Sequence, residues 1–321
     1  MKLKRWLSRG IVLAMVVALM VPMPVAAKSS KAGGKLVSSY TEYTWNVAGN
    51  RWEKRLKVDY TYDKKGNPVK EADTWYSNHF LGVPTWQNTN TYTTKYKYKG
   101  KALKSMKERN EAKSVTETRK YKNGKAVNVM STEYNSMFVN NVEKVTVTDE
   151  NTAYTYNKEG LVVSTLKATN KTYNDGTKPG VEYVAWNFAV TQSKGVPSLI
   201  QAIYGGESWS NADGVGQEAA VTYPDYYSLF NGQGLVIEEG YYTDDKAAAH
   251  TASRWVEYTV KKGKVKQAVV YELRENASGN EVKTPVKRVT FKYNKKSISK
   301  VRYLSMINSL VGTDNSEFNW R

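Results

Sequence analysis

Carboxylates are the first residues of this sequence that could carry out chemistry, because some of them occur in adjacent pairs. A pair of carboxyl groups can serve as acid and nucleophile in glycoside hydrolysis. Neighbouring residues on a strand point to opposite faces, so one adjacent pair does not aim two carboxyl groups at one bond. An enzyme acting on polysaccharide would have to combine acids across residues 204–245. The acids concerned are Asp213, Glu218, Glu238, Glu239, Asp244 and Asp245.

Other catalytic and metal-binding residue sets are missing from the sequence. The two histidines, His79 and His250, lie far apart in the chain, and a metal site would need both to converge with a carboxylate. The chain has no cysteine, which excludes thiolate catalysis, disulfides and Cys-based zinc sites. No serine lies in a G-x-S-x-G elbow. We therefore predict no catalytic residue, no metal site, no cofactor and no enzymatic activity.

Aromatic side chains are the remaining candidates for ligand contact, with nine Trp and 24 Tyr. Flat rings with a polar edge can stack on sugars. In the segment 75–90 they alternate with Asn and Gln, a mixture suited to glycan hydroxyl groups. Many of the tyrosines are expected instead to pack as cross-strand partners. The predicted ligand-binding residues are Trp75, Tyr76, Trp86, Tyr92, Tyr204 and Trp209.

The charge of the chain is strongly positive, at +18. Four of these charges belong to the first 27 residues, so the remainder carries +14. Of the 48 basic residues, 11 are Arg and 37 are Lys. Lysine is a hydrated point charge, whereas arginine is preferred for bidentate phosphate and base recognition. This composition favours diffuse attraction to a polyanion over specific nucleic-acid binding. Lysines that only cover solvent-exposed faces and protect strand edges are the alternative.

Residues 1–27 have the pattern of a signal peptide. Basic residues precede a short apolar core, Ile11 to Val21, and small residues end the segment at Ala27. The apolar core is shorter than the roughly 20 residues that span a bilayer, and no other stretch approaches that length. We predict a mature chain from Lys28 to Arg321 that forms one domain, is secreted or associated with the cell wall, and is of bacterial origin.

The elements that must position these residues are β-strands. Apolar and aromatic residues alternate with polar ones in several segments, which is the period-two pattern of a half-buried strand. Helical spacing is not sustained after the first 27 residues. Segments with this alternation include 56–62, 92–98, 256–261 and 289–294.

A recurring turn follows many of these strands. Asp or Asn opens the turn by bonding the nearby backbone, and Gly supplies the positive φ that other residues resist. A fresh strand then begins, so the sequence predicts hairpins repeated about every 20 to 40 residues. The copies lie at 45–50, 62–67, 98–100, 121–124, 156–161, 191–195, 230–235, 260–263 and 293–297.

The segments 60–67 and 154–161 resemble the YD repeat of the Rhs family, which has paired aromatics, an acidic or amide turn residue and a following Gly. In that family such hairpins wind into a spiralling β-sheet shell, often around a toxic cargo domain. This chain is too short for such a shell, and no toxin-like domain follows residue 293. The resemblance implies a hairpin-repeat fold in an extracellular setting and no particular activity.

We therefore expect an all-β chain of repeated antiparallel hairpins that forms an elongated twisted meander or a partly rolled sheet. The segments 75–90, 170–179 and 204–227 interrupt the repeat and are expected to be loops. The predicted function is non-catalytic binding of an anionic polymer or glycan through a lysine-rich sheet face and aromatic loops. Assembly through exposed sheet edges and the polysaccharide-acting enzyme remain as alternatives.

Overall fold

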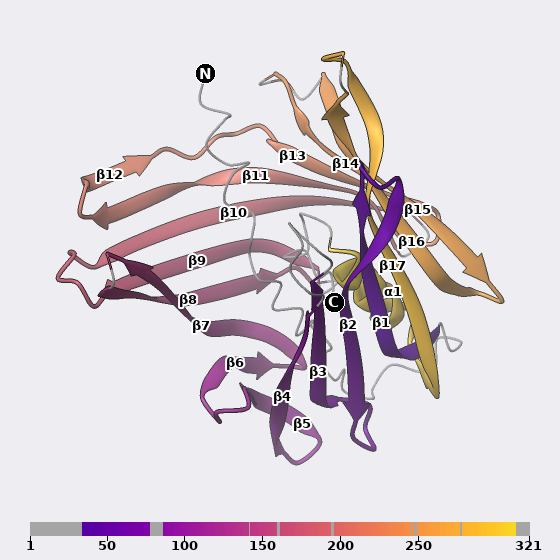
Figure 1. Ribbon diagram of the computed structural model, residues 1–321, viewed down its shortest axis with the longest axis horizontal. Helices are drawn as coiled ribbons and strands as arrows, with labels where there is room; N and C mark the ends of the chain where they lie inside the picture. The colour runs from indigo at the N-terminus through magenta and orange to yellow at the C-terminus, as the bar shows by residue number, and fades with distance from the viewer. Residues whose placement is uncertain are drawn as a thin grey trace.

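The computed structural model describes residues 34–77, 86–140, 142–158, 161–193, 196–244, 246, 249–276 and 278–312. The predicted signal peptide, His79 and the turn residues 194–195 lie outside these ranges. Seventeen strands and one helix occur within them (Figure 1). Their bounds are β1 Gly34–Asn46, β2 Arg51–Tyr62, β3 Pro68–Ser77, β4 Trp86–Lys99, β5 Ala102–Arg109, β6 Val115–Lys122, β7 Lys125–Val139, β8 Val142–Tyr156, β9 Val162–Tyr173, β10 Gly180–Ser193, β11 Val196–Asn211, β12 Gly214–Glu218, β13 Tyr226–Phe230, β14 Val236–Tyr242, β15 His250–Lys261, β16 Lys264–Glu275, β17 Glu281–Ile298 and α1 Lys300–Val311.

The sheet closes on itself, because β1 pairs with both its sequence neighbour β2 and the last strand β17. Tyr40 in β1 lies opposite Val58 in β2 and opposite Phe291 in β17. β11 pairs with β13 as well as with the short β12, so β12 is a side arm and the other sixteen strands form the ring. The all-β hairpin fold is confirmed, but the open meander and the partly rolled sheet are wrong. Closure pairs the edges that an open sheet would leave exposed.

Several strands of the ring present polar residues outward and apolar residues inward. In β4, Thr93, Lys95 and Lys97 are exposed, while the alternating Thr94 is buried and Tyr96 is half-buried. In β2, Leu56, Val58 and Tyr60 are buried on the inner face. The period of two therefore sorts each strand between solvent and the barrel interior.

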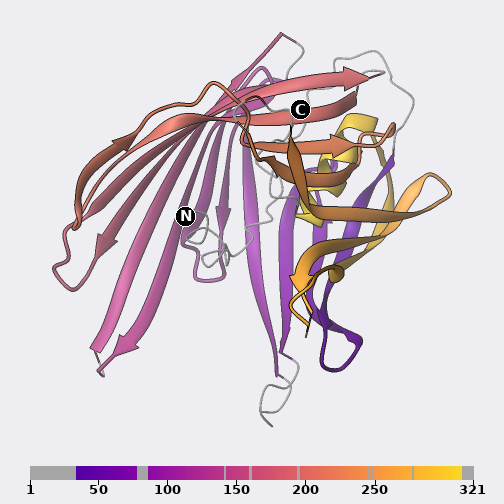
Figure 2. The same cartoon turned by 90° about the horizontal axis from the view of Figure 1, so that it is seen from above.

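The helix α1 lies inside the ring of strands at one end of the barrel (Figure 2). Ser299 caps its N-terminus through its hydroxyl, and Gly312 ends it in the left-handed conformation. Because apolar side chains on most sides of α1 are buried, the helix works as a plug of the barrel rather than as a surface element. The prediction that no helix follows the signal peptide is wrong. The helix residues buried in this core are Tyr303, Leu304, Met306, Ile307, Leu310 and Val311.

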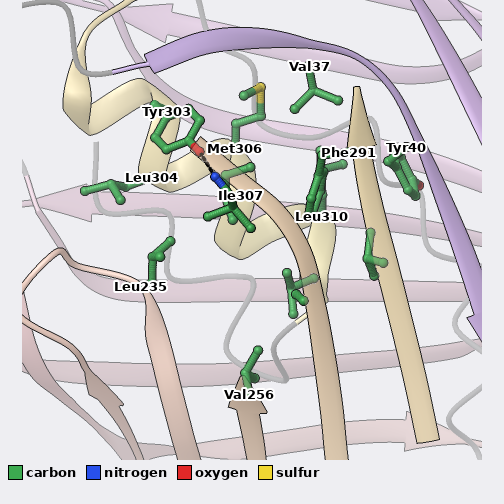
Figure 3. Close-up of a cluster of buried hydrophobic side chains, with 14 of the residues drawn as sticks. Val37, Tyr40, Leu235, Val256, Phe291, Tyr303, Leu304, Met306, Ile307 and Leu310 are labelled. Atoms are coloured by element: carbon green, nitrogen blue, oxygen red, sulfur yellow. Dashed lines mark hydrogen bonds between the residues drawn. The ribbon is translucent and has the colours of Figure 1, made fainter. Parts of the chain in front are cut away.

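Strand side chains and hairpin turns hold the plug in place. Val37, Tyr40 and Phe291 surround Met306, Ile307 and Leu310 in the close-up (Figure 3). Val265 N–H donates to the Tyr303 hydroxyl at 2.7 Å. Two hairpin turns contribute their carbonyl oxygens. Asn308 donates to Gly234 O at 3.0 Å, and Arg302 donates to Gly66 O at 2.6 Å.

Three of the repeated turns have the predicted chemistry, whereas the turn predicted at 293–297 is wrong, because these residues lie within strand β17. The side chains of Asp63, Asn157 and Asn231 each accept a hydrogen bond from the backbone N–H four residues later, at 2.8–3.1 Å. Gly66 and Gly234 both adopt a φ of 87°. The copy at 45–50 differs, since Asn50 takes the positive φ there and the turn lies at the opposite end of the barrel.

A tyrosine beside each of several repeated turns connects successive hairpins. Its hydroxyl donates to a carbonyl 25 to 30 residues earlier, near the start of a preceding strand, at 2.5–2.7 Å. The recurring tyrosines therefore satisfy backbone acceptors on the inner face of the barrel. The bonds are Tyr62 to Val37, Tyr96 to Pro68, Tyr156 to Ala126 and Tyr293 to Val265.

The predicted loops are shorter than expected. Residues 174–179 do connect β9 to β10, but most of 204–227 is strand, because β11 continues to Asn211 and forms a hairpin with β12. Gly205 and Gly206 lie where the register shifts between Val184 and Trp186, which allows the strand to continue. Residues 78–85 of the remaining predicted loop lie outside the described part. No helix in the described ranges is long and apolar enough to cross a bilayer.

Candidate functional site

The hairpin topology gathers lysines at one end of the barrel. Successive strands run in opposite directions, so every second connection returns to the same end, where α1 also lies. We call the lysines in and beside these connections the turn lysines. Asp63 is the one acid described in the same connections, and its carboxylate is bonded to Asn67. The turn lysines are Lys64, Lys65, Lys99, Lys101, Lys122, Lys125, Lys158, Lys261, Lys262, Lys264, Lys295 and Lys296.

The turn lysines lack acidic partners within the described residues, in contrast to some lysines elsewhere on the barrel. Lys57, Lys144 and Lys167 form ion pairs with carboxylates at 2.5–3.0 Å. Within the described residues, none of the turn lysines forms an ion pair. Two of them lie over aromatic rings instead, with Lys65 Nζ 3.5 Å from the Tyr98 ring centre and Lys125 Nζ 5.1 Å from that of Tyr156. This end of the barrel therefore carries a positive field that the described residues do not compensate.

Four carboxylates and one arginine form a second charged group, on the inner face of β3, β5 and β6. Glu108 lies directly opposite Glu117, and Glu71 and Asp73 lie two residues apart on β3. Arg119 donates through Nε to Glu117 Oε1 and, at 3.1 Å, through an Nη to Oε2. Glu71, Glu108, Glu117 and Arg119 are 1–5% exposed. We call this group the inner acidic cluster.

Burial favours the protonated form of three carboxyl groups of the inner acidic cluster, those of Glu71, Asp73 and Glu108. Burial raises the pKa of Glu108 to about 7, with a further contribution from Glu117. Burial also raises the pKa of Asp73 to about 6, and burial together with the neighbouring Asp73 charge raises the pKa of Glu71 well above its ordinary value. Asp73 Oδ1 and Glu108 Oε2 have no hydrogen-bond partner among the described residues, which adds to the cost of ionising them.

We predict that the protein becomes less stable as the pH rises from 5 to 8. Unfolded carboxyl groups titrate near 4, so the folded state binds the extra protons and its advantage is lost as the pH rises through about 6 to 7. Glu108→Gln keeps an acceptor for Thr116, 3.0 Å away, and cannot ionise. We expect it to raise the free energy of unfolding by about 1–3 kcal/mol at pH 8 and to leave it nearly unchanged at pH 5. Denaturant titrations at both pH values measure this, and a Glu108→Gln protein that is less stable at pH 8 would contradict it.

The structure does not bring the six predicted ligand-binding residues together. Trp75 lies on the inner face of β3 against the core, and Tyr76 lies on the outer face with Lys54 Nζ 3.8 Å from its ring centre. Tyr92 faces inward opposite Glu71. The backbone of Trp86 pairs with Ser77, and its side chain lies outside the described part.

The other two predicted aromatic residues lie on β11. Tyr204 faces inward, 5.4 Å from the ring of Trp186, and it donates to Glu207 at 3.4 Å. Burial and the Glu207 charge together raise the pKa of Tyr204 to about 12. The ring of Trp209 covers Gly216 in β12, where a Cβ would lie 2.3 Å from the ring. Tyr204 and Trp209 are therefore packed against neighbouring strands and are not loop residues.

Comparison with known proteins gives distant similarities of structure. No known protein family and no curated protein matches the sequence. A porin-like protein from Bacteroides uniformis ATCC 8492 is 10% identical, with a TM-score of 0.46 over 81% of this chain and 99% of that chain. A porin-like protein from Bacteroides vulgatus ATCC 8482 is 12% identical, with a TM-score of 0.40 over 82% and 100%. Similarity this low assigns neither a function nor a location.

The acids of the predicted enzymatic site point in different directions. Glu238 accepts a hydrogen bond from Tyr227 at 2.9 Å on the outer face. Glu239 faces inward, is 3% exposed and pairs with Arg254 at 3.4 Å. His250 packs on the ring of Tyr227, with ring centres 5.1 Å apart. Among the described residues, no group of three or more acids and histidines is arranged to hold a metal ion.

The sequence alone did not predict that the turn lysines gather at one end of the barrel, or that the residues of the inner acidic cluster lie together. The turn lysines are visible in the repeated turns, but their common location follows only from the alternation of strand direction. The inner acidic cluster has a local signal, because Glu117 and Arg119 share the inward phase of β6 with Tyr121. A charged residue at an apolar position of an alternating strand indicates a buried, partnered charge.

Proposed function

We propose that this chain is an exported, non-catalytic binding protein of the cell surface or wall that holds an anionic polymer at its turn lysines. The observation that carries the proposal is that the turn lysines gather at one end of the barrel and that none of them forms an ion pair within the described residues. An unpaired cation on a rigid turn gains more from an external anion than a lysine already bound to a carboxylate.

The spacing of the turn lysines suits an extended polymer. Neighbouring hairpins are two strand spacings apart, or about 10 Å, which is close to the Debye length of about 8 Å at physiological salt. The fields of adjacent turns therefore overlap, and one polyanion lying across this end meets several lysines at once. Because lysine is a point charge without a fixed fork, we expect the polymer to be recognised by charge density more than by sequence.

The lysine-bearing part of the outer wall supports a location on a surface rather than within a bilayer. A transmembrane barrel presents an apolar band to lipid. Here the outward residues of β4 include Thr93, Lys95, Lys97 and Lys99, all of them exposed. Burying such a row of ammonium groups in hydrocarbon would be costly.

A charge-matched pair of variants tests the proposal. The first replaces four turn lysines with Gln, and the second replaces four exposed wall lysines with Gln. Polygalacturonate is the anionic probe, and a neutral glucan of similar length is the control polymer. We expect the turn variant to lose about tenfold in affinity for polygalacturonate, at about 0.3–0.5 kcal/mol for each exposed contact. The turn variant changes Lys99, Lys101, Lys122 and Lys158, and the wall variant changes Lys70, Lys95, Lys107 and Lys120.

The wall variant has the same net charge, so we expect its loss of affinity to be at most about twofold. Equal losses in the two variants would mean that the overall charge, and not the end of the barrel, attracts the polymer. Binding of both polymers that persists at high salt would contradict the proposal and favour the aromatic residues as the contact.

A further inference from the structure

The described outer wall of the barrel has a sector without basic residues. On β7 to β11, beyond Lys125, none of the outward-facing residues is Lys or Arg, and the whole of this sector is described. The charges among them are Asp149, which accepts a hydrogen bond from Thr132 at 2.5 Å, and Glu143 at the end of β8. We call this sector the uncharged face. It comprises the outward positions of 128–138 in β7, 145–153 in β8, 164–172 in β9, 181–191 in β10 and 199–210 in β11.

The same strands do carry charges, but on their inner face. Lys167 Nζ lies 2.6 Å from Glu150, and both side chains point inward from β9 and β8. Glu182 and Glu207 face inward from β10 and β11. Strand periodicity therefore places the charges of β8 to β11 away from the uncharged face. On β2 to β6 the lysines face outward, and the inner face carries apolar residues together with the inner acidic cluster.

Large apolar side chains are exposed on the uncharged face. Leu166 is 49% exposed and Tyr183 is 48% exposed, at the centre of the sector. Met130 and Tyr134 extend the apolar surface along β7, at 37% and 68%. A hollow of about 440 Å³ lies at one side, with Tyr183, Trp209 and Val215 in its lining. Contiguous exposed apolar surface of this kind marks an interaction site.

The charge distribution points to a second copy of this chain as the occupant. The chain has a net charge of +18, so two copies repel each other wherever their lysines meet. The uncharged face is the sector of the described outer wall where β-strands of two copies can approach without such repulsion. When two copies pack through their uncharged faces, the lysine-bearing part of each outer wall lies away from the contact.

The size of the uncharged face is sufficient for a stable contact. Five strands about 4.8 Å apart and about ten residues long cover about 800 Å², which is the share that each partner contributes to a standard interface. We propose that the protein forms a dimer in which the uncharged faces of two copies pack sheet against sheet. Such packing places the two sheets about 10 Å apart and needs no free strand edge. It also differs from the assembly through sheet edges expected above, since the ring leaves its own edges paired.

Sedimentation velocity of the purified chain from about 1 to 100 μM tests the dimer. The double variant Leu166→Lys with Tyr183→Lys introduces four cations into the contact of two copies. We expect the parent chain to be dimeric in this range and the variant to have a dissociation constant at least tenfold higher. Because apolar contact forms this interface, we expect the dimer of the parent chain to persist at 0.5 M salt, where repulsion between copies is screened.

The matched control adds the same charge elsewhere on the wall. Thr61→Lys with Thr93→Lys changes two exposed outward residues of β2 and β4, and we expect it to leave the dissociation constant within about twofold of the parent value. A parent chain that is monomeric at every concentration and salt would overturn the proposal. A dimer that the control weakens as much as the Leu166 and Tyr183 variant would overturn it as well.

Discussion

Replacing Arg119 with Met is expected to destabilise the protein by about 3–5 kcal/mol, because it leaves the buried carboxylate of Glu117 without its cation. Arg119 is 3% exposed and Glu117 is 5% exposed. The Glu117 charge holds the pKa of Arg119 above its ordinary value despite burial. Glu108, directly opposite, would add repulsion to the unpaired carboxylate. The free energy of unfolding from denaturant titration at pH 8 measures the effect.

The double variant Arg119→Met with Glu117→Leu is the control for this prediction. It replaces both charges with apolar groups, and buried ion pairs replaced in this way are often neutral or stabilising. We expect the double variant to regain most of the stability that the single variant loses. A single variant that loses less than about 1 kcal/mol would show that Glu117 is not held in a buried ion pair.

Shortening Ile307 to Ala is expected to cost about 2–5 kcal/mol, as for other large side chains removed from a packed core. Ile307 is fully buried in α1, among strand residues that include Val37 and Phe291. A cavity there would separate the plug from the inner wall. The conservative Ile307→Val variant removes one methylene group and should cost about 0.5–1.5 kcal/mol.

The ratio of these two losses distinguishes a packed plug from a loosely attached helix. Equal and small losses for both variants would contradict the enclosed position of α1. Near-ultraviolet circular dichroism of Tyr303 and its neighbours gives a second observable, since an undocked helix would lose the packed aromatic signal.

The hairpins of this fold could be predicted because local residues determine their turns. The closure of the barrel could not be predicted, because it depends on pairing between strands far apart in the sequence. The turn at Asp63 and Gly66 follows from residues that lie side by side in the sequence. The contact that closes the ring, between Tyr40 and Phe291, joins strands about 250 residues apart and has no local signature. The open sheet was therefore the natural but incorrect expectation.

The helix α1 was not predicted from the sequence because it is buried on most sides. A helix with a single apolar face shows an amphipathic period, whereas α1 also buries Ser305 and Asn308 among its apolar residues. Its ends do carry standard signals, with Ser299 as the N-cap and Gly312 after the last turn. Those two residues would have been sufficient to suggest a helix.

For the proposed site, composition suggests a class of partner but not a place of contact. The lysine excess suggested a basic sheet face, while the turn lysines form an end of the barrel and one sector of the wall lacks basic residues. That separation depends on which strands are neighbours in the ring. The aromatic cluster expected at 75–92 divides instead between two faces of the wall, because Trp75 and Tyr76 are consecutive in a strand.

The most direct test of the central claim is lysine footprinting with and without polygalacturonate. Acetylation at low salt, read by mass spectrometry, reports how accessible each ammonium group is. Binding at the turn lysines predicts protection of Lys99, Lys101, Lys122 and Lys158 that disappears at 0.5 M salt, with Lys95 and Lys107 on the wall unchanged. Protection of the wall lysines equal to or greater than that of the turn lysines would contradict the claim that this end of the barrel holds the polymer.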